Sequence, residues 1–425
     1  MSRTAYINAR LIDPSTGMDE IGTLVIEDEW IAACGAEVDA PEGAEIVDCG
    51  GHILAPGLID LSVHVGEPGA EHKETMDSVT RAAAAGGVTT IIIQPDTDPV
   101  IDDVAILEMV ARRARKIDRV RVEAMGTITH GRLGEALGEI GLLKQSGAVA
   151  FTDAGRTIRS AAVMRRALSY ADTLGALLIT HAEDPDLGAA GVMNEGELST
   201  RLGLPGIPAA AELMGLERDI RLSELTGARC HIDQISAAGS VDILEDAKSV
   251  GIPVTCGVSA AHLTLNQNDI GEYRTFFRLS PPLRSEDDRQ ALIDGLARGI
   301  IDVVHSNHMP EDQEAKRQPF ELAGIGAIGV ETLLPAMLSL VHAGELELMT
   351  ALRAVSSAPA QLLGLEEGTL DVGAPADLVL IDLNTPWVLT LDALQSKSKN
   401  TPYEDRRLQG RAIRTIVRGR TVFEL

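Results

Sequence analysis

Cysteine is scarce in this 425-residue sequence. The four cysteines, Cys34, Cys49, Cys230 and Cys256, are scattered, and no Cys-x-x-Cys pair occurs. This usage lacks the spacing of a small secreted disulfide framework, so a reduced, cytoplasmic protein is expected.

Positive charge and long apolar runs are also in short supply. Lys and Arg total 37 against 63 Asp and Glu, giving a formal charge of −26. Such a chain repels nucleic acid and anionic membrane surfaces, so neither is an expected partner, whereas a basic protein surface would suit it. No apolar run reaches the roughly 20 residues that cross a bilayer, and nothing near Met1 resembles a signal peptide.

What is present indicates a folded α/β protein, because the chain is 45% hydrophobic and contains 41 glycines. Its length suits a barrel domain of roughly 250 to 300 residues plus a second module. Short alternating runs broken by turn residues predict β-strands in residues 1–55 and 366–425. We expect these two ends to share one small composite β-sandwich around a barrel at residues 56–365.

Between the ends, β-rich runs alternate with helical patterns, the signature of parallel strands joined by helices. The predicted strands are 58–64, 88–94, 120–127, 149–153, 177–181, 229–235, 253–258 and 301–307. The clearest predicted helices are 75–85, 103–115, 160–173 and 286–298. Because no Gly-x-Gly-x-x-Gly follows the first strand, a nucleotide-binding sheet is disfavoured, and a (β/α)₈ TIM barrel is predicted.

The first barrel strand organises the expected site. It ends in Ser62-Val63-His64, and Pro68-Gly69 then breaks it. A metallohydrolase barrel would carry His-x-His there, because side chains two apart on a strand point the same way and can share one metal ion. In this chain the first of those positions is Ser62.

Polar residues follow several other strands. In a barrel they meet at one rim, where the active sites of such proteins lie. Singly, a histidine at a strand end is more often structural than a ligand, but several strands delivering His or Asp to one rim favour a metal site or its descendant. The rim candidates are Ser62, His64, Asp153, His181, Glu183, His231, Gln234, His305, Asn307 and His308.

The sequence resembles the dihydroorotases of the amidohydrolase superfamily over essentially its whole length. The segments that carry the resemblance are Pro56-Gly57-Leu58-Ile59-Asp60, Glu67-Pro68-Gly69, Glu71-His72-Lys73-Glu74-Thr75, Gly86-Gly87-Val88-Thr89-Thr90, Pro281-Pro282-Leu283-Arg284, Pro319-Phe320 and Ser398-Lys399-Asn400-Thr401-Pro402. The resemblance implies a zinc-dependent cyclic amidase that interconverts dihydroorotate and carbamoyl-aspartate in pyrimidine synthesis.

The family's metal site is only partly present. The resemblance implies ligand roles for His64, Asp153 and His181, which match the family pattern. It also implies ligands at Ser62, Gln234 and Asn307, where family members have His, His and Asp. Serine and the two amides are weaker ligands, and an asparagine cannot serve as the general base that the aspartate provides. We therefore expect no zinc or weakly bound zinc, with His308 or Glu183 as substitute bases if Asn307 is not the true equivalent.

The substrate side departs from the family as well. Gly66 stands where the resemblance implies an arginine that pairs with the substrate carboxylate. Asp96 and Ser280 replace asparagines, and Ala261-His262 replaces a His-His pair. Of the substrate-side residues, His308 alone matches.

These losses lead to three hypotheses. The first is a dihydroorotase-like pseudoenzyme of the kind found in some bacterial aspartate transcarbamoylases, which would form a homo- or hetero-oligomer with the transcarbamoylase catalytic subunit as a non-catalytic scaffold. The second is an active dihydroorotase, or related cyclic amide hydrolase, with a degenerate mononuclear site. The third is altered specificity, in which Gly66 and Asp96 accept a neutral or cationic cyclic ligand.

Overall fold

Eight parallel strand positions close into a barrel at the centre of the structure, a computed structural model that describes residues 3–189 and 191–425. The barrel strands are β6 (Leu58–Val63), β7 (Val88–Ile93), β8 (Arg121–Ala124), β9 (Leu178–Thr180), β12 (Cys230–Ile232), β13 (Val254–Ser259) and β14 (Val303–His305). Phe151 supplies the remaining position through parallel bridges to Gly126 and Leu178, and a bridge between Val63 and His308 closes the ring. The predicted TIM barrel is confirmed, although the run 149–153 forms only this bridge.

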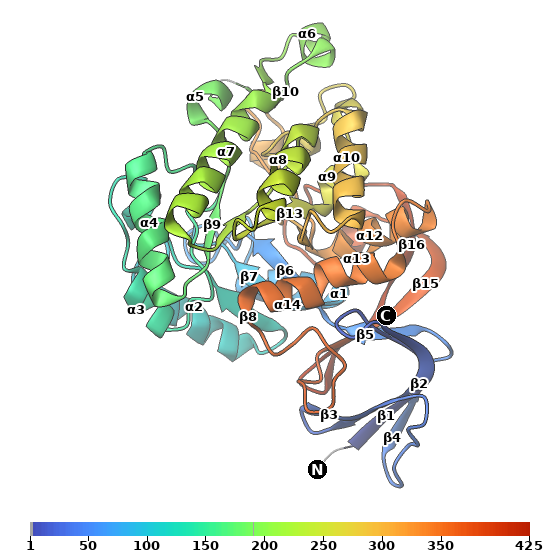
Figure 1. Ribbon diagram of the computed structural model, residues 1–425. Helices are drawn as coiled ribbons and strands as arrows, with labels where there is room; N and C mark the ends of the chain where they lie inside the picture. The colour runs from blue at the N-terminus through green and yellow to red at the C-terminus, as the bar shows by residue number, and fades with distance from the viewer. Residues whose placement is uncertain (1–2, 190) are drawn as a thin grey trace.

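Helices surround the barrel and cover the outer face of its strands (Figure 1). Every residue of β6 and β7 is buried, as continuous apolar runs in parallel strands should be. The longer helices are α1 (Met76–Ala85), α2 (Val104–Ile117), α3 (Ile140–Gln145), α4 (Ala161–Leu174), α7 (Ala209–Thr226), α8 (Ala238–Ser249), α10 (Glu286–Ala297), α12 (Leu333–His342), α13 (Leu348–Val355) and α14 (Ser357–Leu363). Side-chain caps start several of them: Thr75 caps α1, Ser160 caps α4 and Ser285 caps α10.

Short helices, strands and 3₁₀ turns lie in the loops. These are helices α5 (Pro185–Gly188), α6 (Glu197–Leu202), α9 (Ala260–Thr264) and α11 (Gln313–Lys316), the strand pair β10 (Met193–Asn194) and β11 (Gly206–Ile207), and the 3₁₀ turns η1 (His130–Arg132), η2 (Gln267–Ile270), η3 (Thr275–Phe277), η4 (Val330–Thr332) and η5 (Leu391–Ala393). The turn η1 borders the rim of the barrel, and its last residue, Arg132, lines the cleft there.

A second sheet joins the two ends of the chain. Its strands are β1 (Arg3–Asp13), β2 (Met18–Glu27), β3 (Trp30–Gly35), β4 (Glu45–Asp48), β5 (Ile53–Pro56), β15 (Leu378–Val388), β16 (Arg407–Val417) and β17 (Arg420–Glu424). They run in the order β17-β16-β15-β5-β1-β2-β3, with β4 also paired to β1. Tyr6, Leu24 and Leu378 lie in a core of this sheet that is separate from the core of the barrel.

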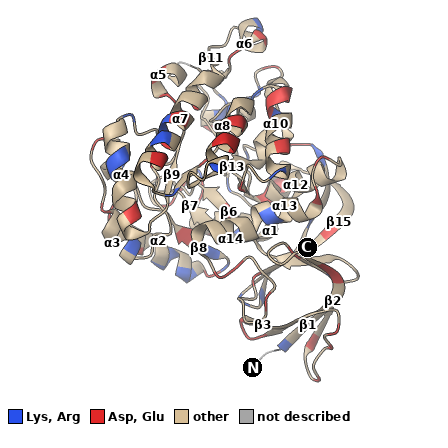
Figure 2. Ribbon diagram, viewed as in Figure 1, with Lys and Arg blue, Asp and Glu red and all other residues tan. Residues whose placement is uncertain are grey.

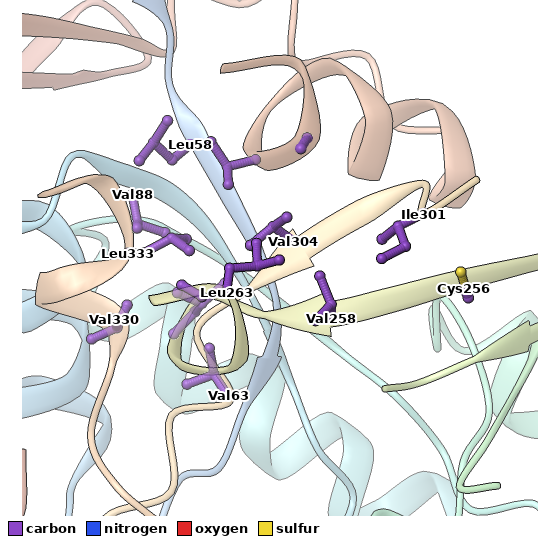
Figure 3. Packing of buried hydrophobic residues seen from close by; sticks show 14 of the residues in the cluster. Leu58, Val63, Val88, Cys256, Val258, Leu263, Ile301, Val304, Val330 and Leu333 are labelled. Carbon is purple, nitrogen blue, oxygen red and sulfur yellow. The ribbon is translucent and has the colours of Figure 1, made fainter. Parts of the chain in front are cut away.

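The main core fills the space between the barrel strands and their helices. Figure 3 shows Leu58 and Val63 of β6 packed with Val258, Val304 and neighbouring aliphatic side chains. Acidic residues colour the neighbouring outer helices α8 and α10 in Figure 2. Among the described residues, no helix has the length and apolar character needed to span a membrane.

Candidate functional site

The carboxyl ends of the barrel strands bring most of the predicted rim residues to one end of the barrel. Ser62 belongs to β6 and His64 follows it, and Gln94 and Asp96 follow β7. Asp153 follows the Phe151 bridge, and the remaining rim residues are His181 after β9, Gln234 after β12 and Asn307 after β14. This is the end at which TIM barrels place their chemistry.

Ser62 is tied to the neighbouring strand. Its hydroxyl accepts a hydrogen bond from Gln94 Nε2 at 3.0 Å, and both side chains are buried. A histidine at position 62 would have to displace this amide. The strand end is therefore built around a serine, with the Gln94 amide occupying the space beside it.

His64 forms a pair with Asp96. The His64 Nδ1 and Asp96 Oδ2 atoms are 2.7 Å apart, and His64 is 8% exposed. Burial alone would raise the pKa of Asp96, but the His64 imidazole and the Arg132 guanidinium outweigh it and hold that pKa below its usual value. An ionised Asp96 accepts a hydrogen bond from the Nδ1–H group, which leaves Nε2 as the nitrogen of the ring that the chain does not engage.

Asp153 is held by the loop after β8. Its Oδ1 accepts the backbone N–H groups of Ile128 and Thr129 at 3.0 Å, and its Oδ2 accepts the Thr129 hydroxyl at 2.5 Å. Burial nevertheless raises the pKa of Asp153. The donors hold the carboxylate against the loop, so its orientation is fixed by the chain itself.

Asp153 and His181 line an open cleft of about 630 Å³ at this rim. Thr157 anchors the segment after β9 by donating to the carbonyl oxygens of His181, at 3.1 Å, and Glu183, at 2.8 Å. Ser280 also borders the cleft. Its volume is in the range of small-molecule sites.

Gln234 and Asn307 are engaged on another part of the rim. Gln234 Nε2 donates to His262 Nδ1 at 2.9 Å, and burial lowers the pKa of His262 to about 4. Asn307 adopts a left-handed backbone conformation with φ of 47° and directs its amide to the Ser280 carbonyl at 3.5 Å. Neither amide titrates, so neither can move a proton.

His308 does not reach the cleft. It is 0% exposed, and its Nδ1 accepts the backbone N–H groups of Gly329 at 3.3 Å and Val330 at 3.4 Å. Its Nε2 faces Glu74 Oε2 at 3.6 Å. Fully buried Glu74 also accepts the hydroxyls of Ser78 and Ser396, which ties the C-terminal segment to the start of α1.

Gly66 is enclosed by the turn that follows β6. A Cβ atom built there would lie 2.2 Å from the Ala70 carbonyl oxygen and 2.7 Å from that of Glu74. Ala70 N also donates to Gly66 O at 2.5 Å, which closes the turn over the position. No side chain fits here without a change in the backbone.

Sequence reasoning missed two cleft residues, Arg132 and Arg156, which both lie outside the barrel strands. Arg132 donates from Nε to the Asp153 carbonyl at 3.0 Å and from Nη2 to the Ala154 carbonyl at 2.6 Å. Arg156 lies beside it, with Nη1 at 3.3 Å from the Arg132 carbonyl oxygen. The signal that could have found Arg156 is its place three residues after Asp153, at a strand end.

The side chains do not assemble a ready metal site. Across residues 3–189 and 191–425, no three His, Cys, Asp or Glu side chains converge in a way that could hold a metal ion. His64 is paired with Asp96, and both Asp153 oxygens accept hydrogen bonds from the chain. The residual metal set of His64, Asp153 and His181 stays a prediction.

Comparison with known proteins gives a consistent result. Residues 51–240 match the family model "Dihydro-orotase-like", and residues 340–423 match the model "Amidohydrolase family". A curated protein named dihydroorotase from Pelobacter propionicus is 44% identical over 416 residues, covering 98% of each chain. Another, from Wolbachia sp. subsp. Drosophila simulans, is 41% identical over 423 residues, covering 99% of this chain and 96% of that protein.

Solved structures agree on the fold. The L-hydantoinase (dihydropyrimidinase) from Arthrobacter aurescens superposes with a TM-score of 0.90 at 25% identity, covering 100% of this chain and 96% of that one. The dihydropyrimidinase from Brevibacillus agri NCHU1002 superposes with a TM-score of 0.86 at 23% identity, covering 99% and 95%.

These relatives correct one expectation. The sequence led us to expect a non-catalytic pseudoenzyme scaffold, but proteins 41–44% identical over nearly the whole chain are named dihydroorotase. The pseudoenzyme interpretation is wrong, and the alternative of an enzyme is better supported. The error came from judging the site by departures at the expected ligand and substrate positions, such as Ser62, Gln234 and Gly66, when other polar groups of the rim come from loops.

Proposed function

The chain belongs to the dihydroorotase family of the amidohydrolase superfamily, and from that premise we propose that it is an enzyme that opens and closes cyclic amides of the dihydroorotate type. The observation that carries the proposal is the similarity to curated dihydroorotases, which extends over 98% or more of this chain at 41–44% identity. The open cleft at the polar rim is large enough to admit a small cyclic amide.

The reaction sets a clear demand on the site. In the hydrolytic direction, the oxygen of water bonds to a ring carbonyl carbon, the ring C–N bond breaks, and the nitrogen leaves with a proton. Ring closure reverses each step and releases water. A group at the rim must therefore take a proton from water and return it to nitrogen, which is general acid–base catalysis.

His64 is the best placed group for this proton transfer. Asp96 holds its Nδ1 at 2.7 Å, as a carboxylate orients the imidazole of many general bases, and Nε2 makes no hydrogen bond within the part of the chain that the structure describes. Gln234 and Asn307 are neutral donors that do not exchange protons in the useful range. The chemistry thus depends on His64, with Asp96 as its positioning residue.

The test is a turnover assay of the chain purified without chelator, with metal content measured on the same sample. We expect interconversion of dihydroorotate and carbamoyl-aspartate, and a loss of about 100-fold or more in His64→Ala. His72→Ala is the matched control, because His72 is an exposed histidine eight residues away with a side chain 63% accessible. Absence of both turnover and dihydroorotate binding in the unaltered protein would refute the proposal.

Three finer statements stay predictions alongside it. They are weak or absent zinc, association with an aspartate transcarbamoylase catalytic subunit in a homo- or hetero-oligomer, and a cytoplasmic location. Metal analysis checks the first, and co-purification with the transcarbamoylase of the same organism checks the second. Fractionation of cells checks the third.

A further inference from the structure

We propose that Arg132 and Arg156 form the site that binds the carboxylate of an anionic cyclic amide, in place of the arginine that Gly66 lacks. This inference rests on the proposed function and deepens it, because it names the charged group that the cleft selects. Four observations support it: the missing charge at Gly66, the contact of the Arg156 guanidinium with the Arg132 carbonyl, the place of both side chains in the cleft, and the backbone geometry.

Gly66 cannot recognise a carboxylate. It has no side chain, and the Ala70 carbonyl blocks the direction in which one would grow. Asp96, paired with His64, adds a negative charge to the rim. An anionic substrate therefore needs positive charge from another part of the rim to offset this repulsion.

Arg132 and Arg156 supply positive charge at the cleft; Arg132 also acts electrostatically on Asp96, but neither arginine lies within ion-pair distance of a carboxylate among the described residues. In a chain with 63 acidic and 37 basic residues, most cleft arginines would be expected to find a carboxylate partner. Within the described ranges these two form no ion pair with a carboxylate, and their printed hydrogen bonds go to carbonyl oxygens. Burial lowers the pKa of Arg132; the nearby Asp96 carboxylate opposes this and the charge of Arg156 adds to it, so the net shift of that pKa is downward.

Two like charges held side by side carry a free-energy cost that an anion would relieve. Guanidinium groups suit a carboxylate in particular, because their planar N–H donors match its two oxygens. Both side chains line the 630 Å³ cleft together with Asp153 and His181. The cleft therefore places both arginines beside Asp153 and His181, two of the predicted rim residues.

The backbone around the pair is strained in a way that fixes its position. Arg132 has φ of 58° and Ala154 has φ of 45°, both in the left-handed region that side chains other than glycine rarely adopt. Arg132 binds the carbonyl oxygens of Asp153 and Ala154, so the two strained segments hold each other. Strain of this kind concentrates at functional sites.

The experiment compares two ligands that differ by one carboxylate. Binding of dihydroorotate and of 5,6-dihydrouracil, the same ring without the carboxylate, is measured by calorimetry for the unaltered protein and for Arg156→Gln. We expect Arg156→Gln to weaken dihydroorotate binding by about 10-fold or more and to leave dihydrouracil binding unchanged. Arg156→Lys should recover part of the affinity, since it keeps the charge and loses the planar donors.

Arg159→Gln is the matched control. Arg159 borders the same cleft, but it pairs with Asp186 at 2.8 Å and its side chain is 64% accessible, so we expect less than about a twofold change in affinity. Arg132→Lys provides a second variant that keeps the charge. Melting temperatures identify any variant that fails to fold. If the Arg132 variant fails to fold, the Arg156 variants test the inference, because Arg156 is exposed.

Each outcome has one meaning. Selective loss of dihydroorotate binding supports the inference. If the unaltered protein binds dihydroorotate and Arg156→Gln binds it equally well, or if Arg156→Gln weakens both ligands equally, the carboxylate assignment is overturned and the proposed function stands. If the unaltered protein neither binds nor converts dihydroorotate, the proposed function fails, and the inference that rests on it fails too.

Discussion

The rim of this barrel has two sides that treat their polar side chains differently. On the closed side, Glu74, His262 and His308 are at most 2% exposed, and each contacts other groups of the chain. On the open side, Arg132, Arg156 and His181 line a cleft of about 630 Å³. The difference teaches that a polar residue at a strand end is not by itself a site. What distinguishes the open side is that its arginines face a cleft and lie outside ion-pair distance of a carboxylate in the described residues.

The largest effect should come from the closed side. Glu74→Ala removes the acceptor of the Ser78 and Ser396 hydroxyls and of the Lys397 N–H, and leaves His308 without its carboxylate. We expect the free energy of unfolding to fall by about 3 to 5 kcal/mol, measured by urea denaturation.

Its matched control is Glu71→Ala, three residues earlier and exposed, which should leave the free energy of unfolding nearly unchanged. A small loss in Glu74→Ala would break the comparison, because the closed side would then not be a structural tie.

The next effect is a pH dependence that also belongs to the closed side. Burial lowers the pKa of His262 to about 4 and that of His231, in the barrel interior, to about 3. Because the unfolded chain binds protons at these histidines near pH 6.5 and the folded chain does not, stability is present above that pH and falls as the pH drops toward 4.

Each of these two histidines should contribute a slope approaching about 1.4 kcal/mol per pH unit in that window. The measurement is urea denaturation at several pH values, and His262→Gln should flatten the curve if the variant folds. A curve that His262→Gln leaves unchanged would contradict the assignment.

A smaller effect sharpens the comparison within the open side. Thr129 donates to Asp153 and accepts the Gly134 N–H at 2.9 Å, so Thr129→Val should cost about 1 to 3 kcal/mol of stability. Thr127→Val is the matched control two residues away, because the buried Thr127 hydroxyl has no hydrogen-bond partner within the residues described. Its replacement should be neutral or stabilising, and equal losses in both variants would refute this account.

The smallest effect is expected at the outer edge of the cleft. Arg159→Gln breaks an ion pair whose side chains are 64% and 80% accessible, so solvent screens most of its attraction. We expect a change in unfolding free energy of about 0 to 1 kcal/mol by the same measurement. A larger loss would show that the outer edge is part of the structural framework.

The sequence predicts the barrel well because its strands are continuous apolar runs. The runs at 58–64 and 88–94 correspond to β6 (Leu58–Val63) and β7 (Val88–Ile93) almost residue for residue. The run at 149–153 reduces to a bridge at Phe151, because Asp153 is drawn to the loop after β8. Hydrophobic periodicity therefore predicts that a strand is present, but it does not predict where side-chain hydrogen bonds to a neighbouring loop end the strand early.

The site is less predictable, for a physical reason. Strand ends fix the positions of His64, Asp153 and His181, whereas Arg132 belongs to a 3₁₀ turn and Glu74 to the loop before α1. No repeating pattern dictates where such residues point. The contacts of His308 likewise depend on the turn at Asn307 and on backbone groups of Gly329 and Val330, which lie far along the chain.

The enclosure of Gly66 limits how this position can be engineered. An arginine placed here would bring its Cβ atom to 2.2 Å from the Ala70 carbonyl oxygen and 2.7 Å from that of Glu74, so the backbone would have to move before the guanidinium could be accommodated. A charge introduced at this turn would therefore need a compensating change in the segment between positions 66 and 74.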